Sequence, residues 1–413
     1  MDSDRPEEIK ARYRSLVESG EDPGDWAYAW RSELNRGGFR AVDFLMEEIV
    51  ETGKCVGCAA CVTICPTDVF DYVDERPVDT REGACVRCVL CADVCPSLRP
   101  PDPDSEDVIG LRKPVQEDGF GPYSYEFLAR SKQNSMVEAT QDGGFTSELL
   151  IHLLRQGEIQ GAVLGDTFED NPQQGYQRLA RSAEEVMDCA GSRYTYSPNT
   201  VALKEAMEND IKPIAVVGVP CQVNGVRQQQ HSSIRLEVNK WYRNNISLVI
   251  GLFCSEAFTN ESVTSIAEDY GVPLTDIENI NIKGKVIVRF KGGKEEILSL
   301  QEYQRYARPA CLYCTDYACD QADIGVGGIG LDNWTYVVVR TEAGHKATQS
   351  LLESGAIETI EVPERAKKLL ARLSKKKANK PLPAQLPTLQ ERIASGDLDP
   401  KNFQGAVAGG KDK

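Results

Sequence analysis

Apolar and polar residues alternate along this chain in two distinct patterns. One consists of short, almost uninterrupted apolar runs that stop at glycine or a similar turn residue, as is typical of buried strands; these runs are residues 161–165, 214–218 and 248–253. The other has the period of an amphipathic helix and falls between the runs, at 147–156 and 198–209. Strands that alternate with helices favour an α/β fold with a largely parallel sheet, which we assign to residues 110–345.

Three further segments have their own patterns. Residues 280–300 predict a hairpin insertion that turns at Lys291, Gly292 and Gly293. Residues 1–50 carry two apolar stripes at helical spacing, so we expect a helical N-terminal arm. Residues 346–413 are expected to form a C-terminal helix followed by a basic, proline-rich tail. The lysines and arginines of 363–380 are interpreted first as a solvated helix surface and second as a contact for an acidic partner.

Composition narrows the class of protein. The 413 residues are 41% hydrophobic and 27% charged, which is the balance of a soluble protein of two or three domains. No apolar run reaches the roughly 18 residues of a membrane span. The acidic start of the chain lacks the apolar segment of a signal peptide, so we expect a cytoplasmic protein. The formal net charge of -16 disfavours nucleic acid as a partner.

Eight of the 14 cysteines form two copies of one motif, C-x2-C-x2-C-x3-C-P. This spacing places three thiolates on one loop, where they can hold three irons of a [4Fe-4S] cube, while the fourth thiolate belongs to the other cluster. We therefore predict an α+β ferredoxin domain of the bacterial two-cluster type over 51–100. One cluster is predicted on Cys55, Cys58, Cys61 and Cys95, and the second on Cys65, Cys85, Cys88 and Cys91.

Disulfides and zinc are the alternative uses of these cysteines. Disulfides require an oxidising compartment, and zinc sites use paired C-x2-C knuckles rather than triplets that end in Cys-Pro. A two-cluster domain carries electrons, which gives the N-terminal arm two interpretations. It either caps the ferredoxin domain or, as we favour, docks on a larger redox complex.

A second set of cysteines follows the predicted strands. Cys221 and Cys254 each come after an apolar run, and Cys311 and Cys314 form a C-x2-C pair. Since loops at the carboxyl ends of parallel strands gather over one crevice, these four thiols predict a third [4Fe-4S] site. Buried structural cysteines, zinc and a redox dithiol are the other interpretations. Cys189 and Cys319 are left over, and Cys319 is the first substitute if one of the four is wrong.

Taken in order, the motifs of the α/β segment resemble the flavin-containing beta subunits of coenzyme F420-dependent hydrogenases and dehydrogenases. The motifs span residues 142–147, 191–194, 218–222, 251–254, 283–285 and 311–324. With the preceding ferredoxin domain, the chain is similar to the input subunit of F420H2 dehydrogenase in particular. The family often has Ser where Asp142 stands.

The resemblance implies an α/β domain that binds FAD and takes coenzyme F420 as substrate. The implied cofactor contacts are Gly143, Gly144, Phe145, Thr146, Ser147, Gly191, Ser192, Arg193, Tyr194, Lys283, Gly284, Lys285 and Asp323. Glycines at a helix start let backbone amides approach a pyrophosphate, and the basic residues would add positive charge. By themselves, these features would be read as an ordinary turn and as surface charges. No side chain is assigned as catalytic, because the flavin performs hydride transfer.

The implied function is that of an oxidoreductase which exchanges hydride between F420 and FAD. It would relay single electrons through three [4Fe-4S] clusters to or from a partner of the hydrogenase, formate dehydrogenase, heterodisulfide reductase or F420H2 dehydrogenase type. Two alternatives stay open. One is an iron–sulfur flavoprotein of the same fold that reduces another substrate with electrons from ferredoxin, and the other is a flavin-free electron conduit.

Overall fold

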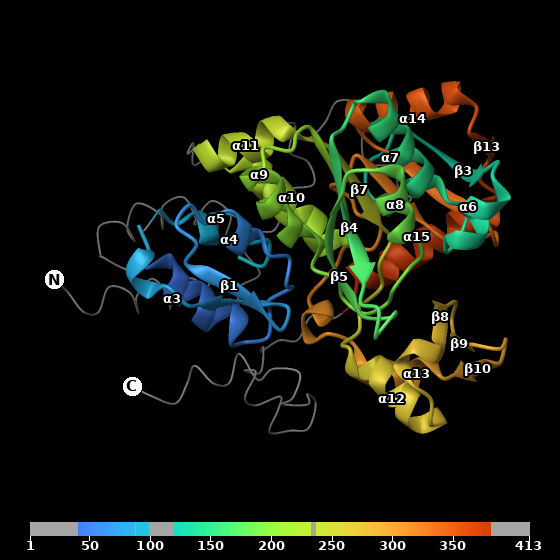
Figure 1. Ribbon diagram of the computed structural model, residues 1–413, viewed down its shortest axis with the longest axis horizontal. Helices are drawn as coiled ribbons and strands as arrows, with labels where there is room; N and C mark the ends of the chain where they lie inside the picture. Colours follow the sequence, from blue (N-terminus) through green and yellow to red (C-terminus); the bar gives the residue numbers. More distant parts are fainter. Residues whose placement is uncertain (1–39, 87, 99–118, 233–236, 381–413) are drawn as a thin grey trace. The chain divides into compact units, whose positions relative to one another are not determined.

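The computed structural model describes residues 40–86, 88–98, 119–232 and 237–380 (Figure 1). The chain divides into two compact units, each considered by itself. Among the described residues, the cysteine-repeat unit comprises 40–86, 88–98, 224–232 and 237–243, and the sheet unit comprises 119–223 and 244–380. Most of the expected N-terminal arm, residues 99–118 and the expected tail lie outside the described residues.

The cysteine-repeat unit is built from short elements. Its helices are α3 (Ala41–Leu45), a π-helical turn (Met46–Val50), α4 (Ala60–Thr63), a 3-10 turn (Glu82–Ala84), α5 (Leu90–Asp93) and most of α11 (Glu237–Asn245). The strands β1 (Phe70–Val73) and β2 (Arg76–Asp79) form an antiparallel hairpin. Asp74 and Glu75 both have positive φ in its two-residue turn, as a type I′ turn requires.

This unit extends beyond the predicted boundaries of 51–100. Leu45 and Ile49, from the expected arm, are each 1% exposed, so the described end of the arm is part of this unit's core. The described residues of 224–243, which are distant in sequence, also belong to the unit. Within it, the Tyr242 hydroxyl donates to the Thr63 carbonyl at 2.6 Å, and Gln229 donates to the Ala60 carbonyl at 3.1 Å. Buried polar contacts of this kind fix the orientation of α4.

The described part of the sheet unit contains a mixed sheet of eight strands. Its spatial order is β13-β3-β12-β11-β7-β6-β4-β5. The strands are β3 (Tyr125–Ser131), β4 (Gly161–Thr167), β5 (Gly175–Ala180), β6 (Ile214–Gly218), β7 (Ile246–Leu252), β11 (Ile324–Gly327), β12 (Thr335–Val339) and β13 (Ile357–Ile360). Only β11, β7, β6 and β4 run parallel, while the other pairings are antiparallel. The expectation of a largely parallel sheet is therefore wrong for the flanks, whose strands the sequence pattern did not orient.

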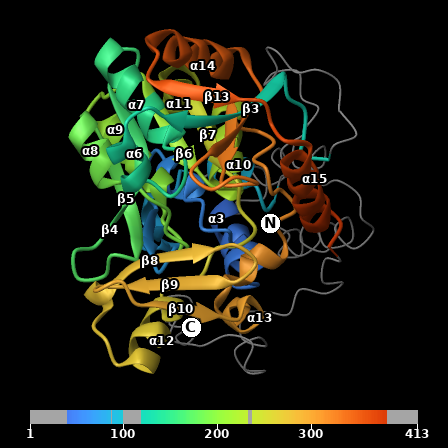
Figure 2. The same cartoon turned by 90° about the vertical axis from the view of Figure 1, so that its right-hand side faces the viewer.

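Helices cover both faces of this sheet (Figure 2). They are α6 (Asn134–Ala139), α7 (Phe145–Gln156), α8 (Ala183–Asp188), α9 (Ala202–Glu208), α10 (Pro220–His231, shared between the units), α14 (Glu342–Ser354) and α15 (Glu364–Ala378). Successive side chains of β12 point to opposite faces of the sheet, so they pack into two different hydrophobic cores. Val337 and Val339 pack with α7 and α14, whereas Tyr336 and Val338 pack with α15. The sheet is thus buried on both sides at this strand.

The predicted hairpin insertion is confirmed and gains a third strand. The strands β8 (Ile277–Ile282), β9 (Val286–Phe290) and β10 (Glu295–Leu298) form an antiparallel layer beside α12 (Glu261–Tyr270) and α13 (Leu300–Tyr303) (Figure 1). The turn between β9 and β10 contains Gly292 and Gly293, both with positive φ, which glycine adopts without strain.

Residues 346–380, expected at the start of a C-terminal appendage, belong to the sheet unit. They complete α14, add the edge strand β13 and supply α15, whose Ala366 and Leu370 are fully buried. Within the described residues, none of the helices combines the length and apolar character that crossing a bilayer requires.

Candidate functional site

The two copies of the cysteine motif fold alike. Ala59 and Val89 occupy equivalent positions in the two copies and directly precede α4 and α5. Both adopt the left-handed region, with φ of 55° and 57°. Only glycine adopts this region without strain, and a β-branched valine rarely does, so the surrounding loop must hold both residues there. The repeat in sequence is therefore also a repeat in backbone conformation.

The first thiol group combines three cysteines of the first copy with one of the second. Burial raises the pKa of Cys61, and the charges of Cys58, Cys55, Cys95 and Cys91 raise it further. Burial and then the charge of Cys55 raise the pKa of Cys95 to about 12. Cys55, Cys58, Cys61 and Cys95 therefore lie near one another, with Cys91 of the second copy also close to Cys61, and their assignment to one cluster stays a prediction.

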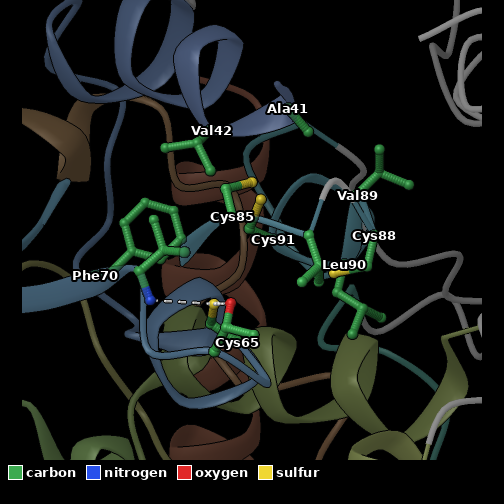
Figure 3. A pocket seen from close by; sticks show the side chains of 12 residues that line it. Ala41, Val42, Cys65, Phe70, Cys85, Cys88, Val89, Leu90 and Cys91 are labelled. Carbon is green, nitrogen blue, oxygen red and sulfur yellow. Dashed lines mark hydrogen bonds between the residues drawn. The ribbon is translucent and has the colours of Figure 1, made fainter. Parts of the chain in front are cut away.

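The second thiol group lines a hollow (Figure 3). Cys65, Cys85, Cys88 and Cys91 surround it, together with apolar residues that include Phe70 and Leu90. Burial raises the pKa of Cys91, as do the charges of Cys88, Cys65 and Cys85. The Val69 amide donates to the Cys65 sulfur at 3.4 Å, a contact that stabilises a thiolate.

These donor sets fit iron–sulfur clusters. Each group offers four thiols, and the second surrounds a hollow lined by sulfur and apolar side chains, which suits the sulfur ligation of a [4Fe-4S] cube. In the described parts of the chain, no three Cys, His, Asp or Glu side chains converge as they would around one metal ion.

The third thiol group lies in the sheet unit. Cys221 is in the first turn of α10, directly after β6, and Cys254 follows β7. Cys311 lies in a 3-10 turn (Pro309–Leu312), and Cys314 follows it. Burial, followed by the charges of Cys314 and Cys311, raises the pKa of Cys221 to about 12. Burial also raises the pKa of Cys254, with contributions from the other three thiols. The four predicted thiols are therefore electrostatic neighbours.

Local contacts explain how the sequence places Cys221 and Cys254. The Gln222 side chain accepts from the Val219 amide at 3.1 Å and donates to the Ser197 carbonyl at 2.6 Å, which anchors the start of α10. The Cys254 amide donates to the Tyr317 carbonyl at 2.9 Å. These bonds hold the two loops that end β6 and β7.

The two remaining cysteines have other partners. The Cys319 thiol is fully buried and donates to the Leu252 carbonyl at 3.1 Å. A Cβ on Gly251 would lie 2.2 Å from the Cys319 Cβ, so Gly251 is needed for this packing. Cys189 ends α8, and its carbonyl accepts from Arg193 at 3.0 Å. Both cysteines therefore have contacts of their own, and the assignment of the four ligands stays a prediction.

Three cations lie near the third thiol group, and none of them belongs to a motif in the sequence. Lys377 of α15 donates to the Cys254 carbonyl at 2.6 Å, and Lys380 donates to the Cys311 carbonyl. Burial alone would lower the pKa of Lys377, but the charges of Cys254, Cys314 and Cys311 raise it above its usual range. The Arg308 guanidinium is buried 3.7 Å from the Tyr196 ring centroid, and its charge acts on Cys221 and Cys311.

The spacing of residues along α15 indicates that Lys377 lies on the buried face of the helix. Ala366, Leu370, Ser374 and Lys377 recur at helical intervals, and all four are buried. The interpretation of 363–380 as a solvated helix surface is thus wrong for this one face. The exposed Lys375 and Lys376 do fit that interpretation.

The glycine-rich turn of the implied flavin site is packed against the sheet. A Cβ on Gly143 would lie 2.2 Å from the Ala129 carbonyl oxygen, and Gly144 has a φ of 78° just before α7. Phe145 is fully buried and packs edge-on against Phe127. Thr146 and Ser147, in the first turn of α7, stay partly exposed.

Asp323, a further implied contact, has partners within the sheet unit. Its carboxylate accepts from the Val249 amide at 2.7 Å and from the Thr341 hydroxyl at 2.6 Å. Thr341 in turn caps α14 by accepting from the Gly344 amide at 3.2 Å. Asp323 therefore ties β7 to the start of α14.

The implied basic contacts differ in their surroundings. Arg193 is used locally, because its Nη1 donates to the carbonyls of Cys189, Ala190 and Gly191. Lys283 is more open and pairs with Asp332 at 2.5 Å and with Asp142 at 3.8 Å. Gly284 and Lys285, which follow Lys283 in the same turn, are exposed. Ser192, next to Arg193, is exposed as well.

Several of these loops meet around Asp142. Lys283 approaches Asp142 from the turn after β8. Tyr194 hydrogen-bonds the Ile282 backbone, and the charge of Asp142 helps to raise the Tyr194 pKa, which burial raises most. The Asp142 Oδ1 is buried and makes no hydrogen bond within the described residues. Burial raises the pKa of Asp142 to about 6. A buried acceptor beside an open lysine and a helix start fits a ligand with both N–H and anionic groups, such as FAD.

Three family descriptions match this chain. Residues 127–204 match the N-terminal part, and residues 211–365 the C-terminal part, of the beta subunit of coenzyme F420 hydrogenase/dehydrogenase. Residues 47–117 match a 4Fe-4S dicluster domain. The first two matches cover the sheet and its insertion, and the third covers the cysteine repeat.

Named relatives agree with these matches. The coenzyme F420 hydrogenase subunit beta of Methanosarcina barkeri is 31% identical over 68% of this chain and 96% of its own length. The F subunit of the F(420)H(2) dehydrogenase of Methanosarcina mazei is 33% identical over 80% of this chain and 92% of its own. A chain of the F420-reducing [NiFe] hydrogenase complex from Methanosarcina barkeri superposes with a TM-score of 0.60 and 30% identity, over 64% of this chain and 92% of that one.

Proposed function

Because this chain belongs to the family of coenzyme F420 hydrogenase/dehydrogenase beta subunits, we propose that it is an oxidoreductase subunit that exchanges electrons between coenzyme F420 and a partner redox complex. The proposal includes one FAD and three [4Fe-4S] clusters as its bound groups. When bound, FAD supplies the exchange between two-electron and one-electron chemistry, and the clusters carry single electrons.

The observation that carries the proposal is that twelve thiols in a chain of this family lie in three neighbourhoods, in which the charges of nearby thiols raise the pKa of one another. The groups on Cys55, Cys58, Cys61 and Cys95 and on Cys65, Cys85, Cys88 and Cys91 would hold the two ferredoxin clusters. The group on Cys221, Cys254, Cys311 and Cys314 would hold the third. Of these twelve side chains, Cys58, Cys61, Cys91 and Cys95 are buried, and the other eight are partly exposed.

The loops around Asp142 are the proposed FAD and F420 site. The first turn of α7, at Thr146 and Ser147, would offer backbone amides to phosphate. Lys283 and Lys285 would supply positive charge, which an anionic substrate needs on a chain of net charge -16. The contacts of Phe145, Arg193 and Asp323 indicate that these residues act by holding the loops in place.

The partner is proposed to be a larger redox complex. Relatives are named as subunits of a hydrogenase and of F(420)H(2) dehydrogenase, which supports a partner of one of these types. The exposed Val86, between Cys85 and Cys88, gives the second thiol group an apolar edge on which such a partner could dock.

A steady-state assay tests the proposal. Anaerobically purified chain is mixed with F420H2 and an artificial one-electron acceptor, and the return of F420 absorbance is recorded. The proposal predicts oxidation that depends on the chain and scales with its flavin content. Flavin-loaded chain that oxidises no F420H2, but accepts electrons from reduced ferredoxin, would instead favour an enzyme for another substrate.

A further inference from the structure

We propose that Lys377 is a positioning residue that raises the reduction potential of the cluster on Cys221, Cys254, Cys311 and Cys314. The inference rests on the proposed function, since it presupposes that third cluster. Lys377 lies outside the cysteine and glycine motifs, on a helix whose sequence pattern predicts a solvated surface.

The geometry places the Lys377 ammonium among the thiols. The residue is 7% exposed, whereas the adjacent Lys375 and Lys376 face solvent. Its Nζ donates to the Cys254 carbonyl at 2.6 Å, and it also hydrogen-bonds the Cys314 side chain. The buried stripe of α15, anchored by Ala366 and Leu370, fixes the helix that carries it.

A buried ammonium is costly unless negative charge compensates it. The Asp316 carboxylate is one source of negative charge, because it interacts electrostatically with Lys377. It also accepts hydrogen bonds from the Cys319 and Asp320 amides. The four thiolates of a bound cluster are the larger source. The burial of the Lys377 ammonium therefore indicates that a negatively charged group binds beside it.

Charge balance gives the direction of the effect. A cluster that accepts one electron from a reductant becomes more negative by one charge, and no bond to its thiolates is made or broken. A fixed cation at short range stabilises the more negative form, and the effect is larger in a partly buried site than in water. Lys377 thus favours the reduced cluster and raises its potential.

Two further cations reinforce this setting. Arg308 is 6% exposed and is held over the Tyr196 ring, while Lys380 donates to the Cys311 carbonyl. Of the three, Lys377 is the one that interacts with Cys254, Cys311 and Cys314 and hydrogen-bonds a ligand sulfur. It is consequently the side chain whose removal should shift the potential most.

The test compares Lys377→Met with Lys377→Arg and with the exposed control Lys376→Met. Iron is counted in each anaerobically purified full-length protein, and a redox titration is followed by electron paramagnetic resonance. The signal of the third cluster is identified by its loss in Cys254→Ser. We expect Lys377→Met to retain its iron and to shift the redox equilibrium about tenfold towards the oxidised cluster, a fall of about 59 mV. Lys377→Arg and Lys376→Met should stay close to wild type.

Every outcome of this experiment either supports or overturns the role of Lys377. A Lys377→Met protein with full iron and an unchanged potential overturns the inference while leaving the proposed function intact. If Lys377→Met loses the cluster, retention in Lys377→Arg supports the requirement for charge, and loss in both variants assigns Lys377 to packing and overturns it. Wild-type protein with about eight irons rather than about twelve removes the third cluster itself, and with it both claims.

Discussion

Gly225 lies so close to Cys58 that a Cβ at this glycine would fall 3.0 Å from the Cys58 sulfur. The same atom would lie 3.2 Å from the Ala60 Cβ. Both distances are shorter than ordinary van der Waals contact, so the second half of α10 is fitted closely to the first thiol group. This contact joins residues 167 positions apart in the chain but within one compact unit.

Gly225→Ala should therefore loosen the first cluster. The added methyl must displace Cys58 or Ala60, and overpacking of this kind costs about 1–3 kcal/mol. We expect faster release of iron to a chelator, measured optically under anaerobic conditions. Gly83→Ala is the matched control, because a Cβ there meets nothing within 4 Å. Equal release rates in the two variants would contradict the close fit.

The assignment of cysteines predicts opposite outcomes for two neighbouring thiols. Cys254→Ser should lower the iron content from about twelve to about eight atoms per chain, since one cluster loses a ligand. Cys319→Ser should keep about twelve, because the Cys319 thiol bonds only the Leu252 carbonyl among the contacts described. Iron and acid-labile sulfide analysis distinguishes them. Loss of iron in Cys319→Ser with retention in Cys254→Ser would exchange their roles.

Asp142 should make stability depend on pH. Its pKa is about 6 in the folded chain, above the unfolded value, because burial outweighs the attraction of Lys283. Protonation therefore favours folding, and the free energy of unfolding falls as the pH rises from about 4 to about 6. Asp142→Asn should stabilise the chain at pH 8 by on the order of 2 kcal/mol, and by roughly half of that at pH 5.

Denaturant unfolding of the two proteins at both pH values measures this difference. The charged groups facing Asp142 are Lys283 and Asp332, so Asp332→Asn is the control for a general change of charge. The control should not reproduce the gain at pH 8. A gain in Asp142→Asn that is the same at pH 5 and pH 8 would show that ionisation is not its cause.

Lys285 tests the location of the anionic substrate. If it attracts F420, Lys285→Ala should raise the KM for F420 roughly three- to tenfold and make it less sensitive to salt. If it holds FAD instead, the variant should purify with less flavin. Lys291→Ala, an exposed lysine in the β9–β10 turn, should do neither. An unchanged KM and full flavin in Lys285→Ala would remove this residue from the proposed site.

The sequence was most informative where chemistry depends on local spacing. The cysteine repeat predicted two neighbouring sets of thiols, and the glycines at 292 and 293 predicted the insertion turn, because both depend on a few adjacent residues. The antiparallel flanks of the sheet were missed because an apolar run does not encode the direction of its neighbour. Lys377 was missed for a related reason. Its burial depends on which face of α15 meets residues 63 to 123 positions earlier in the chain.

The central claim is that F420, a flavin and iron–sulfur clusters exchange electrons on this chain. Rapid anaerobic mixing of the full-length protein with one equivalent of F420H2 tests it most directly, with F420 absorbance, the flavin band and the cluster signal recorded together. The account predicts that F420 appears while the flavin band bleaches and a cluster signal grows. F420H2 that remains unoxidised by protein carrying flavin and about twelve irons would contradict it.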